Sequence, residues 1–283
     1  MDLTAQIVEA ITAWLGSVAA QLYAPALASA GDLLFATPSF DLIPEVAATW
    51  ELVRNVADAL LLLGVTAAGI LVMAAATDAR YSAKVLLPRL VMAGIAANAS
   101  LVACGALIRF ENGLVVSFVG TSGTSYLLGQ LASAALGAGM TQFLPIALAL
   151  AAAIVAMLLI VVYIARDLLL LVGTVLAPLA LVMYALPQTE EVARLWTRAF
   201  SALLFVQVVQ ALLLRIAVQL LQRTEWLGAS SELISGLLLL TLLYVLFKLP
   251  FAAYQWAFQR PLVRSTPVAE LLIGWRALRP VAG

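Results

Sequence analysis

Residues 166–198 read RDLLLLVGTVLAPLALVMYALPQTEEVARLWTR. The stretch opens with a charge pair, Arg166 and Asp167, that directly follows 23 uncharged residues (143–165). A charge at the centre of a bilayer costs about 2.5–3.5 kcal/mol on insertion scales. Because neighbouring helices can satisfy such groups, we expect this stretch to lie inside an assembly of helices.

Twenty further uncharged residues, 168–187, follow the charge pair. Gly173 and Pro178 interrupt this run and Pro187 ends it, and a proline inside a helix costs about 3 kcal/mol. We therefore predict structural breaks at these three residues, and a segment that is bent or re-entrant rather than fully crossing. Trp196, in the charged turn that follows, is predicted to be an interfacial anchor, because tryptophan favours the membrane–water interface.

The composition of the whole chain indicates a membrane protein. Of its 283 residues, 64% are hydrophobic and 11% are charged, whereas about a quarter of the residues of a soluble domain are charged. We therefore predict an all-α, polytopic helical membrane protein with about five transmembrane helices. The single cysteine excludes a disulfide within the chain.

The first part of the chain, residues 1–49, is predicted to lie on the outer side of the membrane. Residues 1–24 carry apolar side chains at three- and four-residue spacing and Pro25 follows them, which predicts an amphipathic helix that ends there. This helix could cover the bundle or dock a partner. Residues 31–49 form an acidic linker.

Residues 50–258 are predicted to form the transmembrane domain. It contains apolar spans at 59–76, 90–108, 143–165, 199–214 and 233–258, and a glycine-rich outer loop at 110–142 with one short helix, 126–136. Residues 259–283 form a basic tail.

Polar residues within the spans are the candidate functional residues. Gln207, Arg215 and Gln219 fall within about 120° of one helical face, and Gln210 lies beside them. Arg215 could extend its side chain to the lipid headgroups or face a wet interior or a neighbouring subunit. The candidate pore or interface residues are Arg166, Asp167, Gln207, Gln210, Arg215 and Gln219.

The distribution of basic residues predicts the orientation. If residues 168–187 do not form a separate crossing, eleven Lys and Arg residues share one side, three lie opposite, and Arg215 lies within a span. Positive charge concentrates on the cytoplasmic side. We therefore predict five membrane crossings, with the N-terminus outside and the C-terminus in the cytoplasm.

The sequence argues against an enzyme. It has no histidine, so metal sites built on imidazole and Ser-His or Cys-His catalysis are excluded. It also has no G-x-x-x-x-G-K-[ST] string, so it does not bind nucleotide through a P-loop. We predict no catalytic, cofactor-binding or metal-binding residues, and any energy must come from partners.

The central part of the chain resembles the TrbL / VirB-six family, the polytopic inner-membrane component of type IV secretion and conjugation machines. The resemblance covers about residues 140–250. It rests on Arg166, the apolar run to Ala177-Pro178-Leu179, Leu186-Pro187, Thr189, Trp196, Phe200, Gln207, Gln210 and Ala211.

This resemblance implies a homo-oligomeric, pentameric ring at the base of a translocation channel. It also implies a minor pilus subunit outside and secretion ATPases inside as partners, in addition to membrane lipid and DNA as a transported substrate. Two other classes remain open, a small-molecule secondary transporter and a structural membrane anchor of another assembly. A transporter should show inverted repeats, and no internal repeat is visible in this sequence.

Overall fold

The computed structural model describes residues 3–74, 83–120, 143–222 and 232–258, which form helices and no strands. The helices are α1 (Leu3–Phe35), η1 (Phe40–Leu42), α2 (Pro44–Ala74), α3 (Ala83–Val119), α5 (Phe143–Val182), η3 (Met183–Ala185), α6 (Glu190–Gln222) and α7 (Glu232–Phe258). Among the described residues, five helices are long and apolar enough to cross a membrane, namely α2, α3, α5, α6 and α7. The predicted fold class and the predicted number of spans are therefore confirmed.

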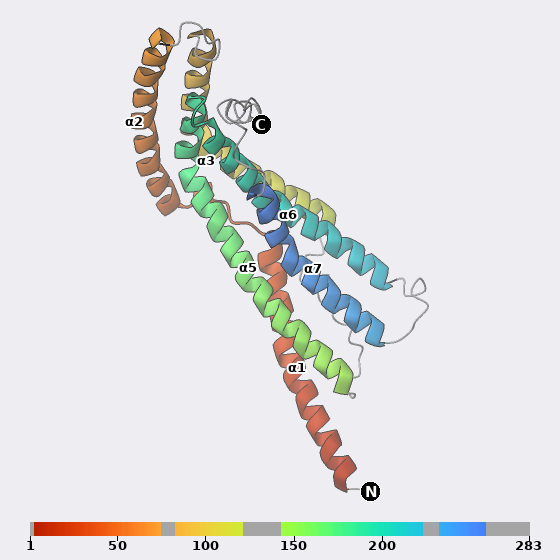
Figure 1. Cartoon of the computed structure of the whole chain (residues 1–283). Coiled ribbons are helices and arrows are strands. Elements are labelled where there is room, and N and C mark those ends of the chain that lie inside the picture. The colour runs from red at the N-terminus through yellow and green to blue at the C-terminus, as the bar shows by residue number, and fades with distance from the viewer. Residues whose placement is uncertain (1–2, 75–82, 121–142, 223–231, 259–283) are drawn as a thin grey trace, which may run out of the picture.

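Helix α5 lies at the centre of the bundle and contacts each of the other long helices (Figure 1). Its 40 residues extend about 60 Å at 1.5 Å per residue, twice the roughly 30 Å of a hydrocarbon core. The mean hydropathy of its span is 2.9, against 1.5–2.0 for the other four. A helix that is apolar on all sides is most stable when other helices surround it.

The prediction that Gly173 and Pro178 break the chain is wrong. Helix α5 continues through both residues to Val182, so 168–182 extend the third span instead of re-entering the membrane. A proline removes one backbone hydrogen bond, and the packing around α5 offsets that loss. The helical structure does end before Pro187, in the turn between η3 and α6, as predicted.

Gly173 is a packing position. A Cβ atom there would lie 3.1 Å from the ring of Phe200 on α6. The Gly173 carbonyl accepts a hydrogen bond of 3.0 Å from the indole Nε1 of Trp196, whose ring stacks on Phe200 with 5.1 Å between centroids. The missing side chain thus lets α6 approach α5 closely.

Several predicted boundaries are also wrong. Helix α1 continues through Pro25 to Phe35 and α2 begins at Pro44, so both helices extend into the predicted linker 31–49. Helix α3 begins at Ala83 and continues past Arg109. Helices can include charges near the ends of apolar runs when the charges are paired, as Arg54 and Glu51 are at 3.2 Å.

The predicted helix at 126–136, the rest of the glycine-rich loop beyond Gly120 and the basic tail lie outside the described residues. The assignment of 1–49 and 259–283 as separate regions stays a prediction. The first ten residues of the predicted loop, 110–119, belong to α3.

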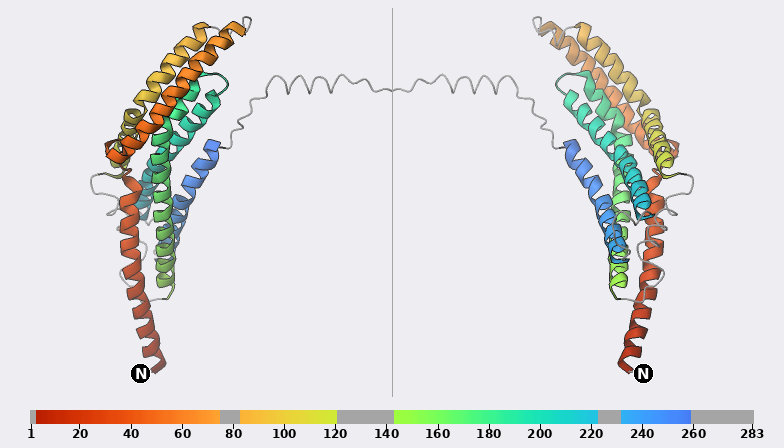
Figure 2. Two further views of the ribbon diagram at one scale, coloured as in Figure 1. Left: turned by 90° about the vertical axis from the view of Figure 1, so that its left-hand side faces the viewer. Right: turned by 90° about the vertical axis from the view of Figure 1, so that its right-hand side faces the viewer.

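The bundle has two apolar regions. The lower apolar region joins α1, the end of α3, the first half of α5, the second half of α6 and α7. The upper apolar region joins α2, the first part of α3, the second half of α5 and the first part of α6. Figure 2 shows the α2–α3 pair on one side of the upper bundle and α1 extending below it. Glu190, at the start of α6, pairs with Arg89 of α3 and holds the α5–α6 turn against α3.

Candidate functional site

Polar side chains from three helices meet between the two apolar regions. Glu111 of α3, Arg166 of α5 and Gln207 of α6 are each buried, with 1–3% of the residue exposed. Thr37, from the segment between α1 and α2, is also buried among them. We call Thr37, Glu111, Arg166, Asp167 and Gln207 the polar layer.

The polar layer is about one helical turn thick. Buried apolar or aromatic side chains flank it on both sides. They stand three residues before and four residues after each of Glu111, Arg166 and Gln207, on the same face of the helix. One set belongs to the upper apolar region and the other to the lower apolar region. The flanking residues are Ile108, Leu170 and Leu204 above, and Val115, Tyr163 and Ala211 below.

Arg166 makes four hydrogen bonds. Its Nη2 donates to Glu111 Oε1 at 3.1 Å, and its Nη1 donates to Asp167 Oδ1 at 3.0 Å and to Thr37 Oγ1 at 2.9 Å. Its Nε donates to the carbonyl oxygen of Leu203 on α6 at 2.9 Å. The guanidinium group thus joins α3, α5, α6 and the segment before α2.

Thr37 fixes that segment in the layer. Its backbone N–H donates to Asn112 Oδ1 at 3.1 Å, and its carbonyl accepts from Asn112 Nδ2 at 2.9 Å. Its hydroxyl lies 2.8 Å from Gln207 Oε1 and 3.2 Å from Glu111 Oε2. Because a hydroxyl has one proton, Thr37 donates to one of these two oxygens at a time.

The layer holds one base and two acids. The side chains of Arg166 and Glu111 are 3% and 2% exposed, and that of Asp167 is 16% exposed. Removing charges from water costs several kcal/mol per ion, and the attraction repays this cost only when the remaining donors are also bonded. Four of the five N–H donors of Arg166 are bonded, and these bonds fix how the four segments align.

A second ion pair lies next to the layer. Arg109 Nη1 donates to Asp41 Oδ2 at 2.5 Å, which joins α3 to η1. Gly105, one turn earlier on α3, makes room for this carboxyl group, because a Cβ atom there would overlap the Asp41 carboxylate. The segment between α1 and α2 is therefore held to α3 at both Thr37 and Asp41.

The predicted polar residues divide into two groups. Arg166, Asp167 and Gln207 meet in the polar layer, and Gln210 is buried one turn further along α6. Arg215 and Gln219 are exposed on the surface of the isolated chain and do not reach the layer. Trp196 is half-buried against α5, and its role as an interfacial anchor stays a prediction.

Gln210 completes a hydrogen bond that a proline removes. Pro250 of α7 has no N–H, so the carbonyl of Leu246, four residues earlier, has no partner within its own helix. The Gln210 Nε2 atom donates to this carbonyl at 2.9 Å. The amide thus compensates for the proline and holds α7 to α6.

Gln210→Leu is expected to destabilise the protein by about 1–3 kcal/mol, because it leaves the Leu246 carbonyl buried without a donor. The same substitution in a Pro250→Ala background should cost much less, since an alanine at this position supplies the helical N–H. Thermal unfolding of the four proteins in detergent measures this double-mutant cycle. Equal losses in both backgrounds would contradict the compensation.

Sequence reasoning missed Thr37, Asp41, Glu111 and Asn112 as site residues. Glu111 and Arg166 are consecutive charges in the sequence, with no other charged residue between them. That long uncharged interval was a usable signal for a buried pair. Thr37 offered no comparable signal, because nothing in a loop threonine indicates burial.

The bonds of the polar layer run between parts of the protein itself. Among the described ranges, no group of three or more His, Cys, Asp or Glu residues is placed to hold a metal ion. Protein oxygens accept hydrogen bonds from four of the five N–H donors of Arg166, so the layer joins the helices to one another.

The five long apolar helices of the described residues and the buried ion pairs of the polar layer define a class of protein. It is a polytopic helical membrane protein with ion pairs buried between its helices. A family model described as TrbL/VirB6 plasmid conjugal transfer like protein matches residues 1–276. The chain therefore belongs to this family, whose members are components of conjugal transfer and type IV secretion. No curated protein and no solved structure matches the chain.

Proposed function

We propose that the protein is an inner-membrane channel or scaffold subunit of a type IV secretion machine, and that its copies form a pentameric ring for the translocation of DNA or protein. The observation that carries the ring is Arg215. It lies in the apolar part of α6, is exposed on the single chain, and has no ion-pair partner among the residues that the structure describes.

A charge facing hydrocarbon is costly, and transmembrane charges usually face a bundle interior or a water-filled cavity. Gln219 is exposed one turn further along α6, so the polar surface is not confined to one side chain. A neighbouring subunit or an aqueous pore next to this face of α6 would accommodate both groups. A closed ring supplies such a neighbour to every copy.

The ring is tested by the mass of the purified protein. Light scattering in mild detergent is expected to give five copies per particle. Disulfide crosslinking between cysteines introduced on the Gln219 face of α6, in a Cys104→Ser background, is expected to join neighbouring subunits. A monomer in every gentle detergent would count against the channel and leave a single-chain anchor as the alternative.

The proposed orientation has the N-terminus outside and the C-terminus in the cytoplasm. With Arg166 placed in the polar layer, it no longer belongs to the cytoplasmic set of bases. Ten Lys and Arg residues of the sequence remain on the proposed cytoplasmic side and three on the other, and such an excess marks the cytoplasmic side.

Labelling of single cysteines tests this orientation. In a Cys104→Ser background, Ser39→Cys is expected to react with a membrane-impermeant maleimide added to intact spheroplasts. Ser265→Cys should react only after permeabilisation. Equal labelling of both positions in intact cells would contradict five crossings.

The proposed partners are a minor pilus subunit outside, secretion ATPases inside and membrane lipid. The predicted outer loop, 110–142, offers no positive charge for a direct contact with DNA. The one base beside it, Arg109, is already paired with Asp41, so it offers little free charge to a phosphate. We therefore propose that DNA passes through the pore as a transported substrate, and we name no residue that binds it.

A further inference from the structure

Three buried polar atoms next to the polar layer have no hydrogen-bond partner. They are the hydroxyl of Tyr163 on α5, Nε2 of Gln207 and Oε1 of Gln210 on α6. The three residues are 0–1% exposed, so bulk water does not reach them. Whichever way the Gln207 amide is turned, one of its two polar atoms lacks a partner.

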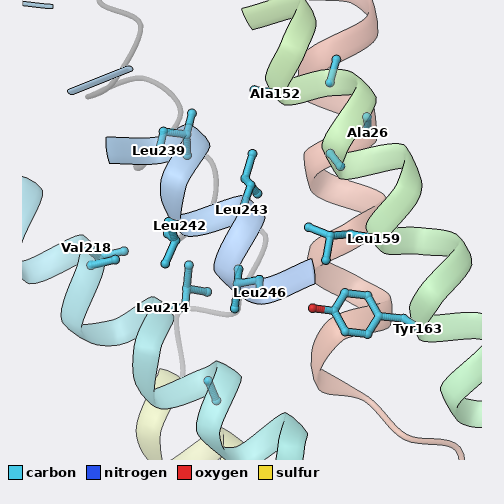
Figure 3. Close-up of a cluster of buried hydrophobic side chains, with 14 of the residues drawn as sticks. Ala26, Ala152, Leu159, Tyr163, Leu214, Val218, Leu239, Leu242, Leu243 and Leu246 are labelled. Atoms are coloured by element: carbon cyan, nitrogen blue, oxygen red, sulfur yellow. The ribbon is translucent and has the colours of Figure 1, made fainter. Parts of the chain in front are cut away.

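Tyr163 and Gln210 approach the same residue of α7, Leu246. The Tyr163 hydroxyl points from α5 towards Leu246 (Figure 3). Gln210 reaches Leu246 from α6, since its Nε2 donates to the Leu246 carbonyl at 2.9 Å. Gln207 lies three residues before Gln210, which places it on the same side of α6 and next to Thr37.

The chemistry of the three atoms is complementary to water. Gln207 Nε2 is a donor, Gln210 Oε1 is an acceptor, and the Tyr163 hydroxyl can act as both. Buried water typically makes two to four hydrogen bonds to polar groups that would otherwise be unsatisfied. An apolar ligand would leave all three atoms unpaired.

We propose that α5, α6 and α7 enclose a bound-water site, formed by Tyr163 and Gln210 next to Leu246 and continued by Gln207 to the polar layer. The water completes the hydrogen bonding of these side chains. It also extends the polar layer from α5 and α6 to α7 beside Leu246, whose carbonyl Gln210 already bonds. The site is independent of the proposed ring, because all its groups belong to one chain.

The direction in which Tyr163→Phe changes Tm tests the site. The substitution keeps the ring that packs in the lower apolar region. If water is bound, the loss of its hydroxyl partner is expected to lower Tm by about 2–4 °C. If the hydroxyl faces no water, its removal relieves an unsatisfied buried group, and Tm should rise or stay the same. Tyr244→Phe, at a residue that is 55% exposed on α7, is the control and should leave Tm unchanged.

Hydroxyl-radical labelling by an X-ray beam locates the water in the intact protein. A water bound to the hydroxyl should make Tyr163, which is 1% exposed, react far faster than a similarly buried apolar ring such as Phe200, which is 4% exposed. A loss of stability in Tyr163→Phe together with this labelling supports the site. An unchanged or raised Tm, or background labelling of Tyr163, would overturn it.

Discussion

Arg166→Leu is expected to destabilise the folded protein by about 3–5 kcal/mol, the range found when one partner of a buried ion pair is removed. The substitution leaves the carboxylate of Glu111, 2% exposed, without its charge partner. It also removes the donors to Thr37, Asp167 and the Leu203 carbonyl. Thermal unfolding in detergent and the steady-state level in the membrane measure the loss.

Two comparison variants make this result specific. Arg194→Leu removes an arginine that is 61% exposed and is expected to change stability by less than about 1 kcal/mol. Arg166→Leu combined with Glu111→Leu should be less destabilised than Arg166→Leu alone, because no uncompensated charge remains at Glu111. If the double variant lost as much as the sum of the two single variants, the Arg166–Glu111 pair would not be coupled.

Arg215→Leu is expected to lower substrate transfer by about tenfold or more, which corresponds to about 1.4 kcal/mol of lost interaction, and to lower the yield of rings. This expectation rests on the proposed function, in which Arg215 faces a neighbouring subunit or the pore. Stability of the single chain should not fall, because Arg215 has no ion pair within the described part of the chain. Transfer frequency and ring mass are measured at matched membrane levels.

Arg215→Lys should restore part of the transfer, since it keeps the charge. Arg198→Leu removes an arginine nearer the start of α6, outside its apolar part, and is the control for loss of charge. Wild-type transfer and assembly in Arg215→Leu would mean that the side chain extends to lipid headgroups, and would contradict its place in an interface.

The sequence alone predicted the helical membrane class and the number of spans, because these depend on local properties. An apolar run of about 20 residues crosses a bilayer whatever its neighbours are. The charge pair at Arg166 also identified the position where α5 must be buried, since lipid cannot accommodate it. The resemblance carried by the central stretch led to the family that matches residues 1–276.

Tertiary structure decided which residues meet. Gln207 and Arg215 share one face of α6 in the sequence pattern, but one is buried and the other exposed. The helical period gives the angle between two residues on one helix, and only the neighbouring helices determine which part of that face they cover. Thr37 is separated from Gln207 by 170 residues, and their hydrogen bond depends on how α3, α5 and α6 pack.

Pro178 is a second position where the sequence pattern and the tertiary structure differ. Its sequence position predicted a break because a proline is costly in an isolated helix. In the folded bundle, α5 continues through Pro178 to Val182, because a helix packed among neighbouring helices tolerates the single hydrogen bond that a proline removes. The sequence by itself thus determined which segments are helical and apolar. The contacts between segments decided where α5 ends and which charges are paired, because the cost of a buried polar group depends on its partners in space.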